Sequence, residues 1–338
     1  MTSPKGKNNI KGKSVFITGG AGFIGSYITE RLLKYEPEKI FILDNFIRGS
    51  QENMKSFTGN PRIEFVEGDI RHAGILDKLM SHSDLCFHLA ALRINACAAN
   101  PEEGFEVMVK STFQLAESAR KHSIKKVVYS SSASVYGLAE HFPTPETDNP
   151  YDNQTFYGAA KLFGEQLFRS YQFMFGLKYI ALRYFNAYGP RMDTDGKYTE
   201  VMIRWLDCIR DGKAPLIYGD GSTSMDFVFV EDIAEANIAA MNSDTENESF
   251  NIGYGRETSL KELLSLLLAA NESSLVPEHR PDNSVNPVSR RLADISKAKK
   301  LLGWSPKIPL EVGLKKLSLW YFQKQKKTTG SSPKQIIR

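Results

Sequence analysis

Residues 14–25 read SVFITGGAGFIG, an apolar run followed at once by a cluster of glycines. Residues 14–18 have the length and the β-branched content of a buried strand, and residues 23–34 have the spacing of an amphipathic helix. Glycines in such a turn let the backbone bend sharply and let an anion approach the helix N-terminus, whose N–H groups favour negative charge. The stretch therefore predicts a strand, a turn and a helix that together hold a diphosphate.

The same alternation of short apolar runs and longer helical patterns continues as far as Arg183. We expect strands at residues 14–18, 39–44, 63–67, 84–89, 126–131 and 178–183, and helices at residues 23–34, 75–80, 101–122 and 156–175. Such alternation predicts βαβ units joined by right-handed crossovers. The expected fold class is α/β, with a Rossmann-type doubly wound parallel sheet.

The pattern changes after Arg183. Residues 184–224 contain several Gly and Asp turn signals around one predicted helix at 199–210. An apolar run at 227–230 and a helical pattern at 231–241 indicate a return to the large domain. We expect a cofactor domain at residues 13–185 plus about 226–255, a smaller C-terminal substrate-binding lobe at 186–225 and 256–322, and flexible tails at 1–12 and 323–338.

The composition is typical of a globular protein from a reducing compartment. Of 338 residues, 41% are hydrophobic and 24% are charged, and the formal net charge of +4 gives no sign of a nucleic-acid partner. The polar start lacks an apolar signal core, and no stretch is long enough to span a bilayer, which predicts a cytoplasmic protein without membrane contact. The three cysteines and six histidines lack ligand spacing, so we expect no metal site.

A carboxylate closes the second predicted strand. Asp44 follows Gly19 by 25 residues, where an acidic side chain can accept hydrogen bonds from the ribose hydroxyls of an adenine dinucleotide. A 2′-phosphate would meet a like charge there, so Asp44 favours NAD over NADP, although the nearby Arg48 is able to accommodate such a phosphate. Asp69 follows the third predicted strand and is placed either to bind the adenine amino group or to cap a turn.

A second constellation combines a tyrosine, a lysine and a serine. Tyr157 and Lys161 are one helical turn apart, so the ammonium can lie near the phenol and favour the phenolate. Ser132 ends a predicted strand at the carboxyl edge of the sheet, where hydroxyl groups face the cofactor crevice. Taking hydride from a carbinol carbon requires a base for the hydroxyl proton. We expect Tyr157 to be this base, Ser132 to hold the same oxygen, and Lys161 to tune the tyrosine and bind the nicotinamide ribose.

These motifs resemble one known family over residues 13–319. The chain is similar to the extended short-chain dehydrogenases/reductases, in particular to the NAD-dependent nucleotide-sugar epimerases and dehydratases such as UDP-glucose 4-epimerase. Beside the serine run, the resemblance rests on GGAGFIG at 19–25, LDN at 43–45, GDI at 68–70, HLAA at 88–91, YGAAK at 157–161, RYFN at 183–186, YGDG at 218–221 and LLGW at 301–304.

The resemblance implies an NAD that stays bound and is reduced and reoxidised within each turnover. The implied cofactor contacts are Gly19, Gly22, Phe23, Ile24, Gly25, Asp44, Asn45, Arg48, Asp69, Ile70, Leu89, Ala90, Ala91, Arg93, Ser130, Tyr157, Lys161 and Tyr184. The substrate would be a sugar linked to a nucleoside diphosphate, most often UDP, and its implied contacts are Arg93, Ser132, Phe185, Asn186, Leu216, Tyr218 and Arg291. Relatives commonly pair two helices per subunit, which implies a homodimer through residues 101–122 and 156–175.

The branch within the family depends on the two residues after Ser132. Dehydratases carry an Asp-Glu pair there and decarboxylases usually keep a glutamate, whereas this chain has Ala133 and Ser134. The resemblance therefore implies 4-epimerisation, in which C4 is oxidised, the keto sugar rotates and hydride returns to the other face. A dehydratase, a decarboxylase or a reductase on the same scaffold is the alternative. A non-catalytic NAD-sensing regulator would usually lack the tyrosine or the lysine.

Several positions depart from the family pattern. Met225 stands where many relatives carry an arginine that grips the diphosphate, which leaves that role to Arg291 or to another residue. Met108 lies in a segment where relatives often have an asparagine behind the cofactor, and Arg93 replaces a frequent lysine. The resemblance therefore does not single out one sugar.

Overall fold

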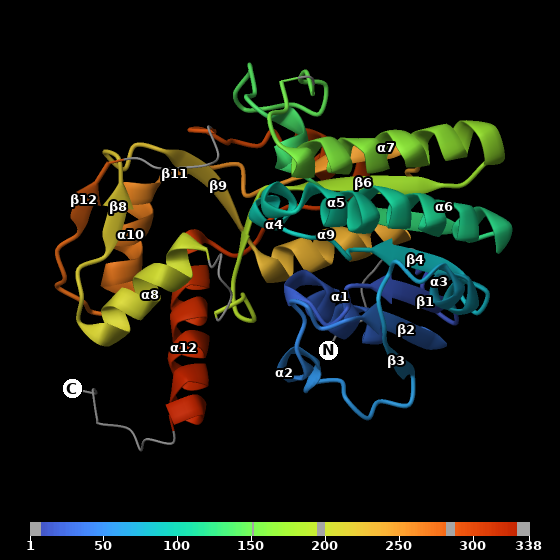
Figure 1. Cartoon of the computed structure of the whole chain (residues 1–338), viewed down its shortest axis with the longest axis horizontal. Coiled ribbons are helices and arrows are strands. Elements are labelled where there is room, and N and C mark those ends of the chain that lie inside the picture. The colour runs from blue at the N-terminus through green and yellow to red at the C-terminus, as the bar shows by residue number, and fades with distance from the viewer. Residues whose placement is uncertain (1–7, 151, 195–199, 282–287, 330–338) are drawn as a thin grey trace.

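The structure, a computed structural model, describes residues 8–150, 152–194, 200–281 and 288–329. Its centre is a seven-stranded sheet in which all neighbouring strands are parallel, in the order β10-β6-β5-β4-β1-β2-β3 (Figure 1). The strands are β1 (Ser14–Thr18), β2 (Lys39–Asp44), β3 (Ile63–Glu67), β4 (Leu85–His88), β5 (Lys126–Ser132), β6 (Tyr179–Tyr184) and β10 (Glu248–Ile252). The order reverses between β1 and β4, which confirms the doubly wound Rossmann-type α/β fold.

Six of these strands agree with the prediction to within one residue at each end. The seventh, β10, has the mixed sequence Glu-Ser-Phe-Asn-Ile, and the prediction did not recognise it as a strand. The predicted run at 227–230 was assigned to the large domain, but it belongs to β9 (Ser224–Phe229), which pairs with β7 (Asn186–Tyr188) and β11 (Glu257–Ser259) in a separate sheet. Phe227 and Phe229 pack there against Tyr188, so their burial does not require the large sheet.

Helices cover both faces of the large sheet (Figure 1). One face carries α3 (Ala73–Met80), α6 (Ser111–Lys121) and α7 (Phe156–Phe175), and the other carries α1 (Phe23–Leu33) and α9 (Val230–Asn242). Successive strand residues point to opposite faces, so Phe16 packs in the first layer and Ile17 in the second. The site described below lies where these strands end.

The predicted helix at 101–122 is divided into three parts. It begins as α5 (Pro101–Phe105), passes through a π-helical segment, η1 (Glu106–Lys110), and continues as α6. Met108 lies in the π-helical segment, and its sulfur accepts a hydrogen bond of 3.2 Å from the backbone N–H of Leu92. Met108 thus contacts the loop after β4 from this π-helical segment.

A smaller lobe lies beside the large sheet (Figure 1). It contains α8 (Val201–Asp211), α10 (Leu260–Ala270), α12 (Leu310–Thr329) and a two-stranded sheet of β8 (Leu216–Tyr218) and β12 (Glu278–Arg280). Trp205, Leu264 and Leu314 meet in a hydrophobic core of its own. The remaining short elements are α2 (Gln51–Met54), α4 (Ile94–Ala99), η2 (Ala133–Tyr136) and α11 (Ser296–Leu302).

Parts of both expected tails make regular contacts or secondary structure where the structure describes them. Ile10 is fully buried, and Asn9 makes two hydrogen bonds to Asn242 at the end of α9, of 2.9 and 3.0 Å. Helix α12 continues to Thr329, past the boundary expected at residue 322, because Gln and Lys residues sustain a helix. Residues 1–7 and 330–338 lie outside the described part of the chain. None of the described helices is long and apolar enough to cross a membrane.

A buried ion pair ties β6 to α7. The guanidinium of Arg183 donates to both carboxylate oxygens of Glu165, with a shortest distance of 2.7 Å, and both side chains are less than a tenth exposed. Ser131 and Ser249, on the two strands that flank β6, donate further hydrogen bonds to the same carboxylate. The pair and these two serines therefore hold α7, which carries Tyr157, against β5 and β6. Ser132 lies at the end of β5.

We expect Glu165→Gln to lower the free energy of unfolding by about 3 kcal/mol, because it leaves the buried charge of Arg183 without a counter-charge. Urea denaturation followed by circular dichroism measures the change. The matched control is Glu64→Gln, which removes a half-exposed carboxylate 3.8 Å from Lys39 and should cost less than about 1 kcal/mol. Equal losses for both variants would contradict the structural role given to Glu165.

Candidate active site

One cavity of about 630 Å³ opens at the carboxyl ends of the large sheet and extends to the small lobe. Each residue expected to contact the cofactor lines it, from Gly19 to Tyr184. Five of the residues expected at the substrate line it as well: Arg93, Ser132, Phe185, Asn186 and Arg291. Leu216 and Tyr218 lie outside this lining, on β8 of the small lobe.

The turn between β1 and α1 leaves no space for side chains. Gly19 has a φ of +73°, and a Cβ on it would lie 2.9 Å from the backbone nitrogen of Ala90. A Cβ on Gly25, in the first turn of α1, would lie 2.2 Å from the carbonyl oxygen of Gly19. The N-terminus of α1 therefore faces the cavity with bare backbone, which is the form that binds a dinucleotide diphosphate.

Asp44 fixes this turn as well as facing the cavity. Its carboxylate accepts hydrogen bonds from the backbone N–H groups of Ala21, at 3.0 Å, and Phe46, at 2.9 Å. Burial raises the pKa of Asp44, and these N–H groups oppose that rise. A carboxylate held at this edge fits the ribose hydroxyls of NAD and disfavours a 2′-phosphate.

Asp69 forms an arrangement that the sequence did not predict. Its two carboxylate oxygens accept hydrogen bonds from the guanidinium of Arg71, at 2.9 and 2.7 Å, and Asn45 donates to it at 3.1 Å. The hydrogen bonds from Arg71 are the main reason that the pKa of Asp69 falls to about 2. Asp69 therefore stays negatively charged, and both Asp69 and Arg71 line the cavity beside the end of β3.

His88 lies beneath the glycine turn and is fully removed from water. Its two ring nitrogens form hydrogen bonds with Thr18, at 2.9 Å, and Thr112, at 3.1 Å. Burial lowers the pKa of His88 to about 3, so the ring is neutral at physiological pH. His88 thus packs β1 and β4 against α6.

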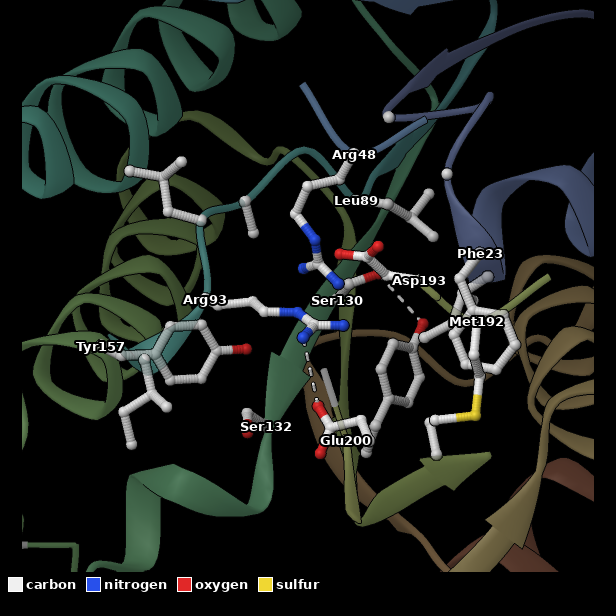
Figure 2. A pocket seen from close by; sticks show the side chains of 18 of the residues that line it. Phe23, Arg48, Leu89, Arg93, Ser130, Ser132, Tyr157, Met192, Asp193 and Glu200 are labelled. Atoms are coloured by element: carbon white, nitrogen blue, oxygen red, sulfur yellow. Dashed lines mark hydrogen bonds and ion pairs between the residues drawn. The ribbon is translucent and has the colours of Figure 1, made fainter. Parts of the chain in front are cut away.

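Tyr157 and Ser132 approach each other inside the cavity. The phenol of Tyr157 points into it from α7, and Ser132 points toward it from the end of β5 (Figure 2). Burial raises the pKa of Tyr157, whereas a hydrogen bond with Ser132 and the positive charges of Arg48 and Arg93 lower it. In the protein alone the burial effect is the larger, and the phenol stays protonated.

Lys161 lies near Tyr157 and is anchored by the backbone of β5. Its ammonium donates a hydrogen bond of 2.6 Å to the carbonyl oxygen of Ser130 and lies 5.8 Å from the centre of the Tyr157 ring. Burial lowers the pKa of Lys161 to about 8. The ammonium therefore lies near the phenol, and its hydrogen bond goes to the backbone of β5.

Two arginines from different loops point into the middle of the cavity. Arg48 follows β2 and Arg93 follows β4, and Figure 2 shows their guanidinium groups near each other. The positive charge of Arg93 lowers the pKa of Arg48, after the larger effect of desolvation, and Asp193 and Glu200 oppose this. Arg48 thus faces the centre of the cavity, and the sequence did not predict the acidic residues Asp193 and Glu200 in its lining.

Arg291 lies on the small-lobe side of the cavity. It is 8% exposed, and its guanidinium donates a hydrogen bond of 2.6 Å to the carbonyl oxygen of Ala133. Among the described residues no carboxylate pairs with it, and burial lowers its pKa to about 10. A buried guanidinium without a counter-charge fits an anionic ligand, and Met225 lines the same cavity without any charge.

Gly25→Ala should weaken NAD binding by at least about tenfold, because the added methyl group displaces the backbone that faces the diphosphate. Calorimetric titration of the protein stripped of its cofactor measures the dissociation constant. Gly74→Ala is the matched control, since it also adds a methyl group in the first turn of a helix but meets no atom within 4 Å. Unchanged NAD affinity in Gly25→Ala would contradict the role given to this turn.

Comparisons with known proteins agree with this geometry. A putative UDP-glucose 4-epimerase from Methanocaldococcus jannaschii is 35% identical over 312 residues, which cover 90% of this chain and 97% of that protein. The structure of a UDP-N-acetylglucosamine 4-epimerase from Methanobrevibacter ruminantium, in complex with UDP-N-acetylmuramic acid, has a TM-score of 0.88 and 31% identity, covering 93% of this chain and 99% of that chain. A UDP-glucuronic acid 4-epimerase from Bacillus cereus, in complex with UDP-glucuronic acid and NAD, has a TM-score of 0.85 and 29% identity, covering 92% and 99%.

The family assignment rests on sequence and fold together. Residues 15–253 match the NAD dependent epimerase/dehydratase family. The cofactor of this family is NAD, and the glycine turn and Asp44 fit it. The chain therefore belongs to the NAD-dependent epimerase/dehydratase family, within the extended short-chain dehydrogenases/reductases.

Proposed function

We propose that this protein is a nucleotide-sugar 4-epimerase that acts on a UDP-sugar with Tyr157 as the base. The observation that carries the proposal is the joint placement of Tyr157, Ser132 and Lys161 in the wall of the cavity, next to Ala133 and Ser134. Its substrate would be of the UDP-glucose/UDP-galactose kind or an N-acetyl or uronate relative.

The chain's own groups can carry each proton step. Tyr157 takes the proton of the C4 hydroxyl while hydride leaves C4, and it returns the proton when hydride comes back. Ser132, which lines the cavity beside the phenol, would hold the same oxygen by a hydrogen bond. When bound, NAD would supply the hydride acceptor and donor, and the pKa of Tyr157 would fall beside its positive charge. Lys161, fixed by Ser130, would bind the nicotinamide ribose and supply positive charge beside the phenol.

The residues after Ser132 favour epimerisation over elimination. Ala133 and Ser134 line the cavity, and neither side chain can take a proton from C5 or give one to a leaving hydroxyl. Dehydratases and decarboxylases that resemble this chain carry such a group directly after the serine. A regulator without activity would have no use for the Tyr157 and Ser132 pair at the end of β5.

The nucleotide would lie on the small-lobe side of the cavity. Arg291 would meet the diphosphate, and Phe185 and Asn186 would lie near the sugar. Leu216 and Tyr218 would flank the base, in a site that extends from the cavity onto β8. In this arrangement the large domain would hold the cofactor and the smaller lobe the nucleotide of the substrate.

Replacing the proposed base gives a direct test. Tyr157→Phe should lower kcat by about a hundredfold or more with NAD retained, because phenylalanine keeps the ring but cannot take the proton. NMR of the products measures turnover, and the absorbance of released cofactor measures NAD content. In D₂O the wild type should give the C4 epimer without deuterium at C5. Unchanged kcat, a 4-keto-6-deoxy product or deuterium at C5 would contradict the proposal.

We further propose that the protein is a homodimer joined through residues 101–122 and 156–175. Phe105 and Phe113 are each 47% exposed, and Phe173 and Met174 near the end of α7 are 80% and 66% exposed. Large apolar side chains on adjacent helices are typical of a protein interface.

Phe113→Glu should convert the dimer into a monomer, because it places a charge within the proposed interface. Analytical ultracentrifugation measures the mass. Val276→Glu is the control, since this valine is 76% exposed on a different part of the chain. A wild-type protein that sediments as a monomer would contradict the interface.

A further inference from the structure

An ion pair crosses the cavity next to the proposed base. The carboxylate of Glu200 lies 3.7 Å from the guanidinium of Arg93. Arg93 precedes α4 on the cofactor side, and Glu200 precedes α8 on the side of the small lobe. Glu200 occupies the N-cap position of α8, yet its side chain accepts no capping hydrogen bond. Its carboxylate is turned instead toward the cavity, which it lines.

The pair lies in the region where the sugar would react. Figure 2 shows Tyr157, Ser132, Arg93 and Glu200 around the same part of the cavity. The positive charge of Arg93 is one of the effects that oppose the rise in the pKa of Tyr157, which burial dominates. Asp193 lines the same cavity and, with Glu200, gives this part of the wall two carboxylates.

We infer that Glu200 is a specificity-determining residue, which admits sugars with an uncharged substituent at C6 and disfavours uronates. The inference rests on the proposed 4-epimerase function and narrows its substrate class to neutral UDP-hexoses and their N-acetyl forms.

The reason is the charge that a uronate would bring. C6 is attached to C5, the neighbour of the reacting C4, so a C6 carboxylate lies close to the atoms held by Tyr157 and Ser132. Because the keto sugar must turn over during 4-epimerisation, its substituents face both walls, and a uronate meets Glu200 in one of the two orientations. Like charges repel, and because the Glu200 side chain is 57% exposed, solvent screens part of this repulsion, so the expected discrimination is about tenfold.

Arg93 does not offset this repulsion while Glu200 is present. Its charge is already balanced by Glu200 at 3.7 Å, so a uronate would have to displace that carboxylate to reach the guanidinium. A neutral C6 hydroxyl, in contrast, can donate a hydrogen bond to Glu200 without breaking the pair. Removing the charge of Glu200 would therefore abolish this repulsion.

The test compares UDP-glucose with UDP-glucuronate in the protein loaded with NAD. Wild-type kcat/KM for epimerisation should favour UDP-glucose by at least about tenfold, and Glu200→Gln should reduce that preference by at least about tenfold. Glu200→Asp keeps the charge and should keep the preference. Glu246→Gln, which removes a carboxylate paired with Lys178 outside the cavity lining, is the matched control and should behave as wild type.

Dissociation constants of the two sugars for Tyr157→Phe, with and without Glu200→Gln, repeat the comparison without turnover. A wild type that epimerises UDP-glucuronate as well as UDP-glucose, or a ratio unchanged by Glu200→Gln, would overturn the inference and leave the 4-epimerase proposal standing. If no UDP-sugar is epimerised, the proposed function fails. The binding preference then still decides whether Glu200 excludes a carboxylate.

Discussion

The close approach of backbone to backbone at the turn between β1 and α1 is the constraint on which the site depends. Gly25 packs its Cα against the carbonyl of Gly19, and Gly19 in turn lies against the backbone of Ala90 after β4. These contacts place the N-terminus of α1 at the carboxyl edge of the sheet and set the loop after β4 beside it. The carboxylate of Asp44, at the end of β2, accepts a hydrogen bond from the N–H of Ala21 and so holds the loop after β2 against the same turn. The loops after β1, β2 and β4, which are distant in sequence, therefore lie in contact with one another.

The distribution of charge around this turn explains how the cavity can serve both a cofactor and a reacting alcohol. Asp44 and Asp69 hold negative charge at one end, and Arg48 and Arg93 hold positive charge in the middle. Tyr157 sits where burial keeps its proton on in the protein alone. As the proposed base, Tyr157 would therefore become active only when bound NAD adds positive charge beside it, which would tie proton transfer to the presence of the cofactor.

Local sequence patterns predicted most strands and helices. Residues that only folding brings together from different loops could not be predicted in this way. Strands such as β1 and β2 and the helix α7 carry regular apolar spacing, so their positions follow from a short window of sequence. Strand β10 was missed because Asn251, a residue uncommon in strands, is buried there by side-chain hydrogen bonds that no local pattern reveals.

Glu200 and Asp193 were missed in the site because only the folded chain brings their loop to Arg93 and Arg48. Leu216 and Tyr218, expected from family resemblance, lie outside the cavity lining because β8 pairs with β12 in the small lobe.

The N-terminal segment has a consequence for how the protein is made. Asn9 bonds to Asn242, a residue 233 positions later, and Ile10 shares a hydrophobic cluster with residues of α9. When synthesis begins, neither partner exists, so this segment leaves the ribosome with its apolar side chain exposed and finds its place only after α9 has been translated. The edge strand β10 arrives later still. Nascent chains therefore remain incomplete for most of translation, and the interval in which chaperones can bind them is long.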